Sequence, residues 1–134
     1  MRVHDNEIIS YQINLKEGEI RMNTEYDNGV MRFWNELVFS GVQAHYFEDE
    51  LPGSLILDIS ILEVEDLFSW PDTVELLHKR KNYGWPMNYD TLENLQNQLK
   101  AEGYNVYVIS ASYGLSGWIL AKSCSEAVTG GEEL

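Results

Sequence analysis

Apolar and polar residues alternate through the first part of the chain, and this period of two restricts the fold more than any other feature of the sequence. Apolar side chains recur at every second position in residues 7–15 and again in residues 19–26. Such alternation is typical of a strand with one buried face. Residues 16–18 end in glycine, and residues 27–29 contain the Asn-Gly pair that favours a tight hairpin turn. Residues 30–40 continue the apolar pattern, so the sequence predicts a three-stranded antiparallel meander.

Three further strands are predicted after the meander. Residues 41–53 are expected to form a loop, and the dense apolar run at residues 55–62 is expected to form a fourth, more central strand. Residues 105–111 and 117–122 have the pattern of two closing strands. Residues 125–134 contain two adjacent glycines and three glutamates, and they are expected to form a flexible acidic tail after a single domain that spans residues 1–124.

Helical signals occupy the segment between the fourth and fifth predicted strands. Capping boxes, in which an N-terminal side chain and one three residues later bond each other's backbone, are predicted to begin helices at Asp72 and at Asp90. Glycines at positions 84 and 103 are suitable helix ends, and Pro71 prevents an uninterrupted helix through that point. The order β-β-β-β-α-α-β-β predicts an α+β fold, with a mostly antiparallel sheet of about six strands and two helices packed on one face.

Negative charge is concentrated in the middle of the chain. The 134 residues contain 22 acidic and nine basic residues, which gives a net charge of −13. No lysine or arginine lies between residues 33 and 78, where ten acidic residues occur. These ten are Glu36, Glu48, Asp49, Glu50, Asp58, Glu63, Glu65, Asp66, Asp72 and Glu75. Such a field repels phosphate groups, so we expect no direct binding to nucleic acid or to an anionic membrane, whereas a basic protein would be attracted. The alternative is that the charge only keeps the surface solvated.

The expected location is the cytoplasm. The first residues lack the apolar core of a signal peptide. No apolar run approaches the roughly 18 residues of a membrane-spanning helix. A single cysteine, Cys124, agrees with a reducing compartment. The edge of the meander could pair between two chains, and the sequence does not define the oligomeric state.

The sequence contains no recognisable catalytic or cofactor-binding pattern. His4, His45 and His78 have no neighbour at zinc-ligand spacing, so we predict no metal site and no cofactor. Cys124 is interpreted as a half-buried structural residue. Ser116 does not stand in the Gly-x-Ser-x-Gly pattern of a nucleophile elbow. An enzymatic function therefore has no support from motifs, although it is not excluded.

Candidate binding residues come from one loop and from the aromatic side chains. His45 precedes the acidic residues Glu48, Asp49 and Glu50 in the predicted loop. Several aromatic residues stand close to glycine or proline, namely Tyr83, Trp85, Tyr113 and Trp118. Tryptophan and tyrosine serve both cores and interfaces. One interpretation is structural: the aromatic side chains pack in the core under the loops. The other is functional: they form a surface groove of aromatic anchors with an acidic rim.

Three segments of the chain resemble a known family. They are Phe39-Ser40-Gly41-Val42 with His45 and Phe47, Tyr83-Gly84-Trp85-Pro86, and Ser112-Tyr113-Gly114-Leu115-Ser116-Gly117-Trp118. Together they resemble a family of small, single-domain bacterial proteins without assigned activity. The resemblance spans residues 7–123 and implies a bacterial, cytoplasmic α+β domain, but it implies no catalytic residue.

Two functional hypotheses follow from the sequence. The first is a non-catalytic, acidic protein-binding domain that docks on a basic partner, as an immunity or inhibitor protein does. Such charge complementarity speeds association and makes it sensitive to salt. The second is a small-molecule-binding domain, or an enzyme without a recognisable motif, with a pocket between sheet and helices. In that case His45 is the expected proton carrier.

Overall fold

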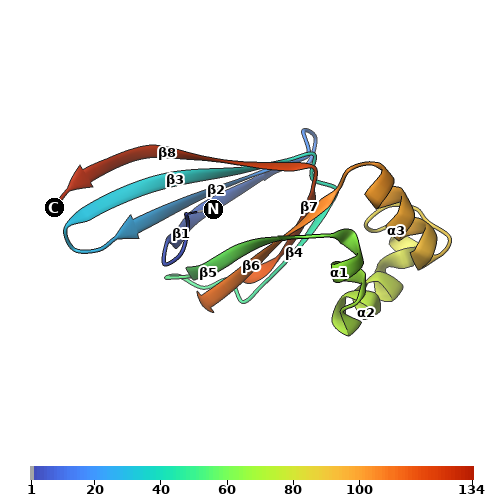
Figure 1. Cartoon of the computed structure of the whole chain (residues 1–134). Coiled ribbons are helices and arrows are strands. Elements are labelled where there is room, and N and C mark those ends of the chain that lie inside the picture. The colour runs from blue at the N-terminus through green and yellow to red at the C-terminus, as the bar shows by residue number, and fades with distance from the viewer. Residues whose placement is uncertain (1) are drawn as a thin grey trace.

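Eight strands pair side by side in the computed structural model, which describes residues 2–134 (Figure 1). The strands are β1 (Glu7–Asn14), β2 (Glu19–Asp27), β3 (Met31–Ser40), β4 (Ala44–Glu48), β5 (Leu55–Leu62), β6 (Asn105–Tyr113), β7 (Ser116–Ala121) and β8 (Ser123–Glu133). The helices are α1 (Val64–Phe68), α2 (Pro71–Arg80), the 3-10 helix η1 (Lys81–Tyr83) and α3 (Leu92–Ala101). All strand pairs are antiparallel, in the order β4-β7-β6-β5-β1-β2-β3-β8. The α+β class and the antiparallel sheet predicted from the sequence are confirmed.

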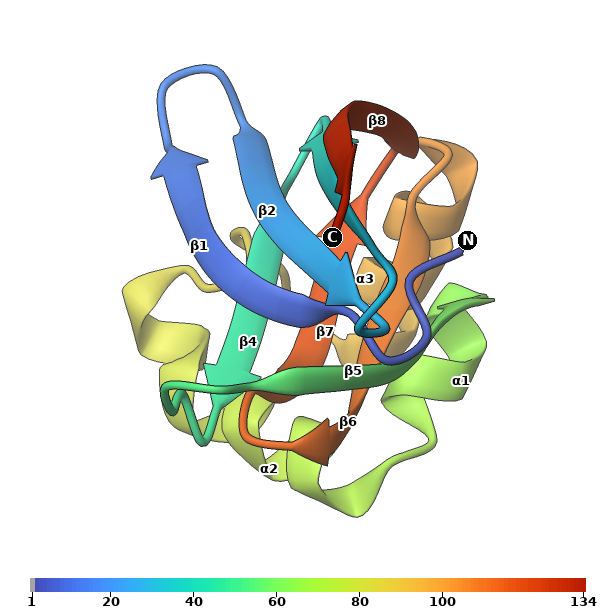
Figure 2. The same cartoon turned by 90° about the vertical axis from the view of Figure 1, so that its left-hand side faces the viewer.

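The sheet folds back on itself into two halves. We call β1, β2, β3 and β8 the β1 half, and β4, β5, β6 and β7 the β6 half. Figure 2 shows β1 and β2 lying in front of β4 and β7. The two halves join narrowly between β1 and β5, where Glu7 pairs with Leu55 and the Ile8 amide donates to the Ser54 carbonyl at 2.9 Å.

On the other side, two strands bend together and pass from one half to the other. Residues 41–43 connect β3 to β4, and Lys122 connects β7 to β8. The Lys122 amide donates to the Ser40 carbonyl at 3.0 Å, so the two bends remain hydrogen-bonded. Gly41 has a φ of +64°, and a Cβ at this position would lie 2.9 Å from the Lys122 Cβ. Glycine is therefore required at this corner because of both its conformation and its crowding.

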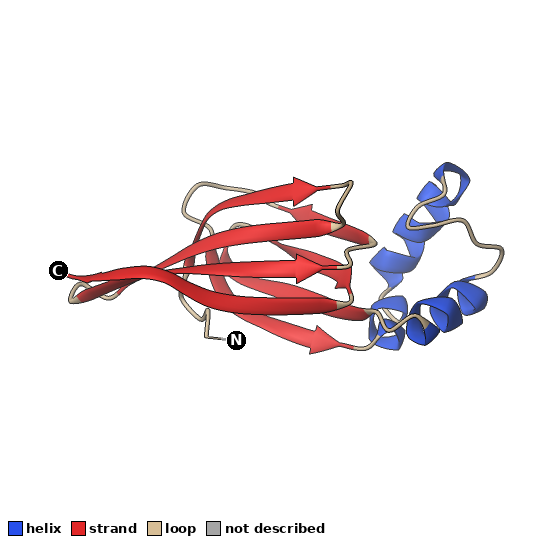
Figure 3. Ribbon diagram, turned by 90° about the horizontal axis from the view of Figure 1, so that it is seen from above, coloured by secondary structure: helices blue, strands red, loops and turns tan. Residues whose placement is uncertain are grey.

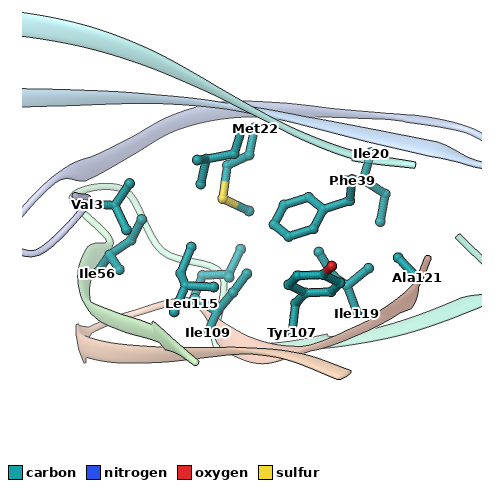
Figure 4. Packing of buried hydrophobic residues seen from close by; sticks show 12 residues of the cluster. Val3, Ile20, Met22, Phe39, Ile56, Tyr107, Ile109, Leu115, Ile119 and Ala121 are labelled. Carbon is teal, nitrogen blue, oxygen red and sulfur yellow. The ribbon is translucent and has the colours of Figure 1, made fainter. Parts of the chain in front are cut away.

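The main core lies between the inner faces of the two halves (Figure 4). Its buried residues are Val3, Ile20, Met22, Leu37, Phe39, Ile56, Ile59, Tyr107, Ile109, Leu115, Ile119 and Ala121. Phe39 on β3 and Tyr107 on β6 meet edge to face, with ring centroids 5.5 Å apart. These strands are not neighbours in the sheet, so this contact exists only because the sheet is folded over.

A second core joins the helices to the outer face of the β6 half. The helices gather at one end of the strands (Figure 3), where Leu77, Leu95 and Leu99 pack in one cluster with residues of β6 and β7. Along β7, Trp118 belongs to this second core and Ile119 to the main core. Strands β6 and β7 are therefore buried on both faces. Within residues 2–134, no helix has the length and apolarity needed to cross a membrane.

The expected number of strands, six, is wrong because two strands lie where a loop and a tail were predicted. Strand β4 falls within residues 41–53. Its two faces contact different cores, Ala44 and Tyr46 on one side and Phe47 on the other. A strand covered on both faces lacks the apolar–polar alternation that marks a half-buried one.

Residues 125–134 were expected to be a tail, but residues 123–133 form β8, which pairs with β3 along its length. This edge strand is mostly exposed, so it has no apolar pattern. Its glycines have a packing reason: a Cβ on Gly131 would lie 3.0 Å from the Phe33 ring, and one on Gly130 would lie 3.2 Å from the Trp34 ring. The Gly-Gly pair that indicated a loose tail instead makes room for two aromatic side chains.

The helices also differ from the prediction in number, in their starting residues and in their packing, because they cover only the β6 half, at one end of the strands, and not one face of the whole sheet (Figure 3). Pro71 is the first residue of α2, where its missing N–H is not needed. It separates the short helix α1 from α2, so three α-helices are present in residues 2–134, not two. The N-cap of α3 is Thr91, whose Oγ1 accepts the Asn94 amide at 3.2 Å, and not Asp90.

Candidate functional site

A groove of about 520 Å³ lies between α2 and the outer face of β4, β7 and β6. We call it the α2 groove and define it by six of its lining residues, Tyr46, Glu48, Trp70, Asp72, Glu75 and Trp118. Its size falls within the range of about 300–1,000 Å³ that is usual for ligand pockets. The α2 groove is the candidate site because it combines a cavity, aromatic side chains and several carboxylates.

Strands β4 and β7 supply the aromatic side of the groove. Alternation along β4 directs Tyr46 and Glu48 to the same face, and Tyr46 pairs with Trp118 of β7. Trp118 is only 6% exposed, so it lies at the bottom of the groove. The two strands approach closely at Gly117, where a Cβ would lie 1.9 Å from the Tyr46 carbonyl oxygen.

Helix α2 supplies the acidic side. The sequence predicted Asp72 as an N-cap, which would have engaged its carboxylate with the helix backbone. The helix begins two residues earlier than that, with Trp70 as the N-cap. Asp72 is therefore in the first turn, where the helix dipole favours a negative charge, and it lines the groove. Glu75 also lines the groove and pairs with Lys79 at 3.1 Å.

The carboxylates of the acidic segment differ in whether a cation neutralises them. Glu36 pairs with Arg21 at 2.9 Å on the outer face of the β1 half, and Glu65 pairs with Lys100. In contrast, neither Glu48 nor Asp72 takes part in an ion pair within residues 2–134. Negative charge without an internal counterion therefore remains at the α2 groove.

Arg80 lies beside the aromatic side chains next to the groove. Its guanidinium carbon is 4.8 Å from the Trp85 ring centroid and 5.9 Å from that of Tyr46. Trp85 in turn contacts Trp118, with centroids 5.9 Å apart. A guanidinium at these distances is attracted by the negative face of an aromatic ring. The aromatic cluster next to the groove thus already holds one cation of this type.

The four aromatic residues predicted from the sequence do not meet in one place. Trp85 and Trp118 are in contact. Tyr83 lies on η1 with 88% of its surface exposed, and Tyr113 lies at the end of β6 with 52% exposed. Neither tyrosine takes part in a ring contact among the described residues. Within residues 2–134, these four residues therefore do not form the predicted surface groove.

The predicted acidic loop is divided between different surroundings. Glu48 lines the α2 groove, and Asp49 is exposed with a left-handed φ of 59°. Glu50 lines a second cavity, of about 400 Å³, together with Tyr11. Burial of the Tyr11 hydroxyl, together with its hydrogen bond to Glu50 and the charge of that carboxylate, raises the pKa of Tyr11 to about 12. Glu50 is therefore engaged with Tyr11.

His45 lies on the opposite face of β4 from the groove. Its ring contacts Phe47, with centroids 4.9 Å apart, and Phe47 packs against the main core. Burial lowers the pKa of His45, and the charge of Glu50 opposes this shift. Because His45 does not line the α2 groove, it is not placed to transfer a proton there.

Metal and thiol chemistry gain no support from the geometry. Among residues 2–134, no three histidine, cysteine, aspartate or glutamate side chains lie together in a way that could hold a metal ion. Cys124 packs against the main core. Burial, and then the charge of Glu126, raise the pKa of its thiol to about 11.

Sequence reasoning missed Tyr46 and Trp70 as parts of a site. Tyr46 falls in the segment predicted as a loop, so its orientation toward the helices was not evident. Trp70 precedes Pro71, and proline is common at the first position of a helix. That pair is the signal that could have indicated an aromatic side chain at the start of α2.

Comparisons of this chain with protein-family models, with curated proteins and with solved structures find no match. The resemblance to a bacterial family therefore stays a prediction. What the protein does has to be argued from the geometry of its groove.

Proposed function

We propose that the protein is a non-catalytic protein-binding domain whose α2 groove docks a basic segment of a partner protein, as an immunity or inhibitor protein would. The proposal depends on one observation: Glu48 and Asp72 line the same groove from two different elements, and neither has an ion-pair partner within residues 2–134. A basic side chain of the partner would supply the missing counterion.

The charge of the whole chain supports the same kind of partner. A net charge of −13 attracts basic proteins over several ångströms and raises the rate of encounter. Exposed charge pairs by themselves contribute little affinity. The aromatic rings of Tyr46, Trp70 and Trp118 give the groove the apolar contact area that anchors a bound segment.

Peptide binding measured at low and high salt tests this proposal. The probe is a capped glycine–serine peptide that carries two arginines and two lysines. Its binding is followed by the NMR signals of the indole N–H groups of Trp70 and Trp118. We expect shifts of both signals and weaker binding at high salt, because salt screens exposed charges.

Charge reversal identifies the groove as the site. The double variant Glu48→Lys/Asp72→Lys should weaken peptide binding by about tenfold or more. The matched control is Glu17→Lys/Glu93→Lys, which changes the net charge equally at two exposed positions outside the groove. Equal loss of binding in both variants, or no binding to the parent protein, would contradict the proposal.

A small-molecule site in the same groove is the second candidate function. The observation in its favour is the groove's volume of about 520 Å³ and its position between the sheet and the helices. Such a pocket would select a small cationic or aromatic ligand. A single free amino-acid amide that binds as tightly as the peptide would favour this candidate over protein docking.

A further inference from the structure

The α2 groove has a chemical feature that distinguishes the two basic side chains of proteins. Its carboxylates could pair with either lysine or arginine, but its aromatic rings are selective. Arginine has a planar, weakly hydrated guanidinium that stacks on aromatic faces and forms two parallel hydrogen bonds to a carboxylate. The lysine ammonium is compact and strongly hydrated, so it loses more hydration free energy on entering an aromatic groove.

The protein provides an internal example of a guanidinium that contacts aromatic rings beside the groove. Arg80 lies over the rings of Trp85 and Tyr46, at 4.8 and 5.9 Å from their centroids. Within residues 2–134, Arg80 makes no ion pair with a carboxylate. The rings thus accommodate a guanidinium that has no carboxylate within ion-pair distance among the described residues.

The lysine that lines the groove is disposed differently. Lys79 also lines the α2 groove, but its ammonium pairs with Glu75 at 3.1 Å, on the same helix. Its side chain is largely exposed, with 70% of its surface accessible. Within the groove, therefore, the lysine contacts a carboxylate at the surface. Outside it, two lysines lie over tyrosine rings, Lys81 over Tyr89 at 5.4 Å and Lys122 over Tyr104 at 5.2 Å. The preference for arginine therefore rests on the chemistry of the guanidinium at a tryptophan-lined groove.

We infer that the α2 groove recognises its partner through an arginine side chain, which stacks on the ring of Trp70 and pairs with Glu48 or Asp72. This inference rests on the proposed function, because it names the residue type that the groove takes from a basic partner. It goes beyond charge complementarity, which would not distinguish arginine from lysine.

Two peptides of equal charge test the inference. Both are capped glycine–serine peptides, one with four arginines and the other with four lysines at the same positions. Their dissociation constants are measured by calorimetry at the same salt concentration. We expect the arginine peptide to bind about fivefold to tenfold more tightly, which is the size of a partly desolvated cation–π contact. Tryptophan fluorescence should respond more strongly to the arginine peptide, because stacking changes the environment of the rings.

Variants of Trp70 separate stacking from charge. In Trp70→Leu the ratio of the two dissociation constants, lysine peptide over arginine peptide, should fall toward one. The affinity for the lysine peptide should change little. Trp70→Phe keeps an aromatic ring, so it should restore the preference. The control is Tyr83→Leu, which removes an aromatic side chain from an exposed position outside the groove. Circular dichroism and thermal unfolding check that each variant is folded.

The outcomes distinguish this inference from the proposed function. If both peptides bind at the groove with equal affinity, arginine recognition is wrong and docking of basic segments remains. If the preference survives in Trp70→Leu, or disappears in Tyr83→Leu, the selective surface lies elsewhere and the inference is also wrong. If neither peptide binds, both are overturned.

Discussion

The ring of Phe39 meets the ring of Tyr107 edge to face, with centroids 5.5 Å apart, although their strands lie far from each other in the sheet order. Phe39 is on β3 in one half and Tyr107 is on β6 in the other. The contact can therefore form only when the β1 half lies over the β6 half. It also lies at the centre of the main core, where both residues are buried.

A double-mutant cycle on this pair should detect the folded-over arrangement. We expect Phe39→Leu and Tyr107→Leu to be coupled by about 0.5–1.5 kcal/mol, the usual value for an aromatic pair. The measurement is the free energy of unfolding in urea for both single variants and the double variant. Phe39→Leu with Leu95→Ala is the control pair, because Leu95 belongs to the second core and distant changes add independently.

Gly117→Ala should be among the most damaging small substitutions in the protein. The new Cβ would lie 1.9 Å from the Tyr46 carbonyl oxygen, so β4 would have to move away from β7. We expect a loss of about 3 kcal/mol of stability. Gly103→Ala is a matched control, since Gly103 also has a positive φ but no atom lies within 4 Å of its Cβ position; it should cost about 1 kcal/mol. Similar losses for both variants would show that the close approach of β4 is not important.

Deletion of residues 125–134 distinguishes a strand from a tail. This deletion removes most of β8 and leaves the outer edge of β3 without a partner. Each backbone hydrogen bond contributes about 1 kcal/mol, so a loss of several bonds should lower the midpoint of urea unfolding markedly. Unchanged unfolding would mean that these residues do not stabilise the sheet.

The stability of the protein should decrease on mild acidification in a way that depends on His45. Burial lowers the pKa of His45 in the folded state below its ordinary value of 6.5. As the pH falls through 6.5, the unfolded chain takes up a proton that the folded chain does not, so unfolding becomes more favourable. His45→Gln should therefore show a smaller loss of stability between neutral and mildly acidic pH than the parent. His78→Gln serves as the control for removal of an exposed histidine, and equal slopes in all three proteins would refute the role of His45.

Cys124 should react slowly with thiol reagents at neutral pH. Its thiol has a pKa raised to about 11 by burial and by Glu126, and only the thiolate is nucleophilic. We expect alkylation by iodoacetamide to be slow in the folded protein and rapid after unfolding in urea. Rapid alkylation of the folded protein near pH 7 would contradict the raised pKa.

The parts of the fold that the sequence predicted are those with one buried face. Strands β1 and β2 alternate clearly because their outer side chains contact water. Strand β4 was missed because both of its faces are covered, and β8 was missed because its contribution is backbone pairing at an edge. Alternation of apolar and polar side chains reveals neither a strand that is buried on both faces nor an exposed edge strand.

The candidate site was predicted only in part, since it depends on how distant segments are brought together. Glu48, Asp72 and Glu75 belong to the acidic segment recognised in the sequence, and Trp118 was among the predicted aromatic residues. Their convergence requires α2 to lie across β4 and β7, which no local pattern encodes. His45 and Glu48 were expected in one loop, but strand geometry sends His45 to the opposite face of β4.

The shared corner at Gly41 and Lys122 determines how this chain can be divided. Because β3 runs on into β4 and β7 runs on into β8, each half of the sheet contains pieces of both continuous strands. Neither half is an independent module that could be excised, exchanged or duplicated by recombination. Probes placed in the two halves should therefore report one common unfolding transition, and the halves should be inherited as a unit.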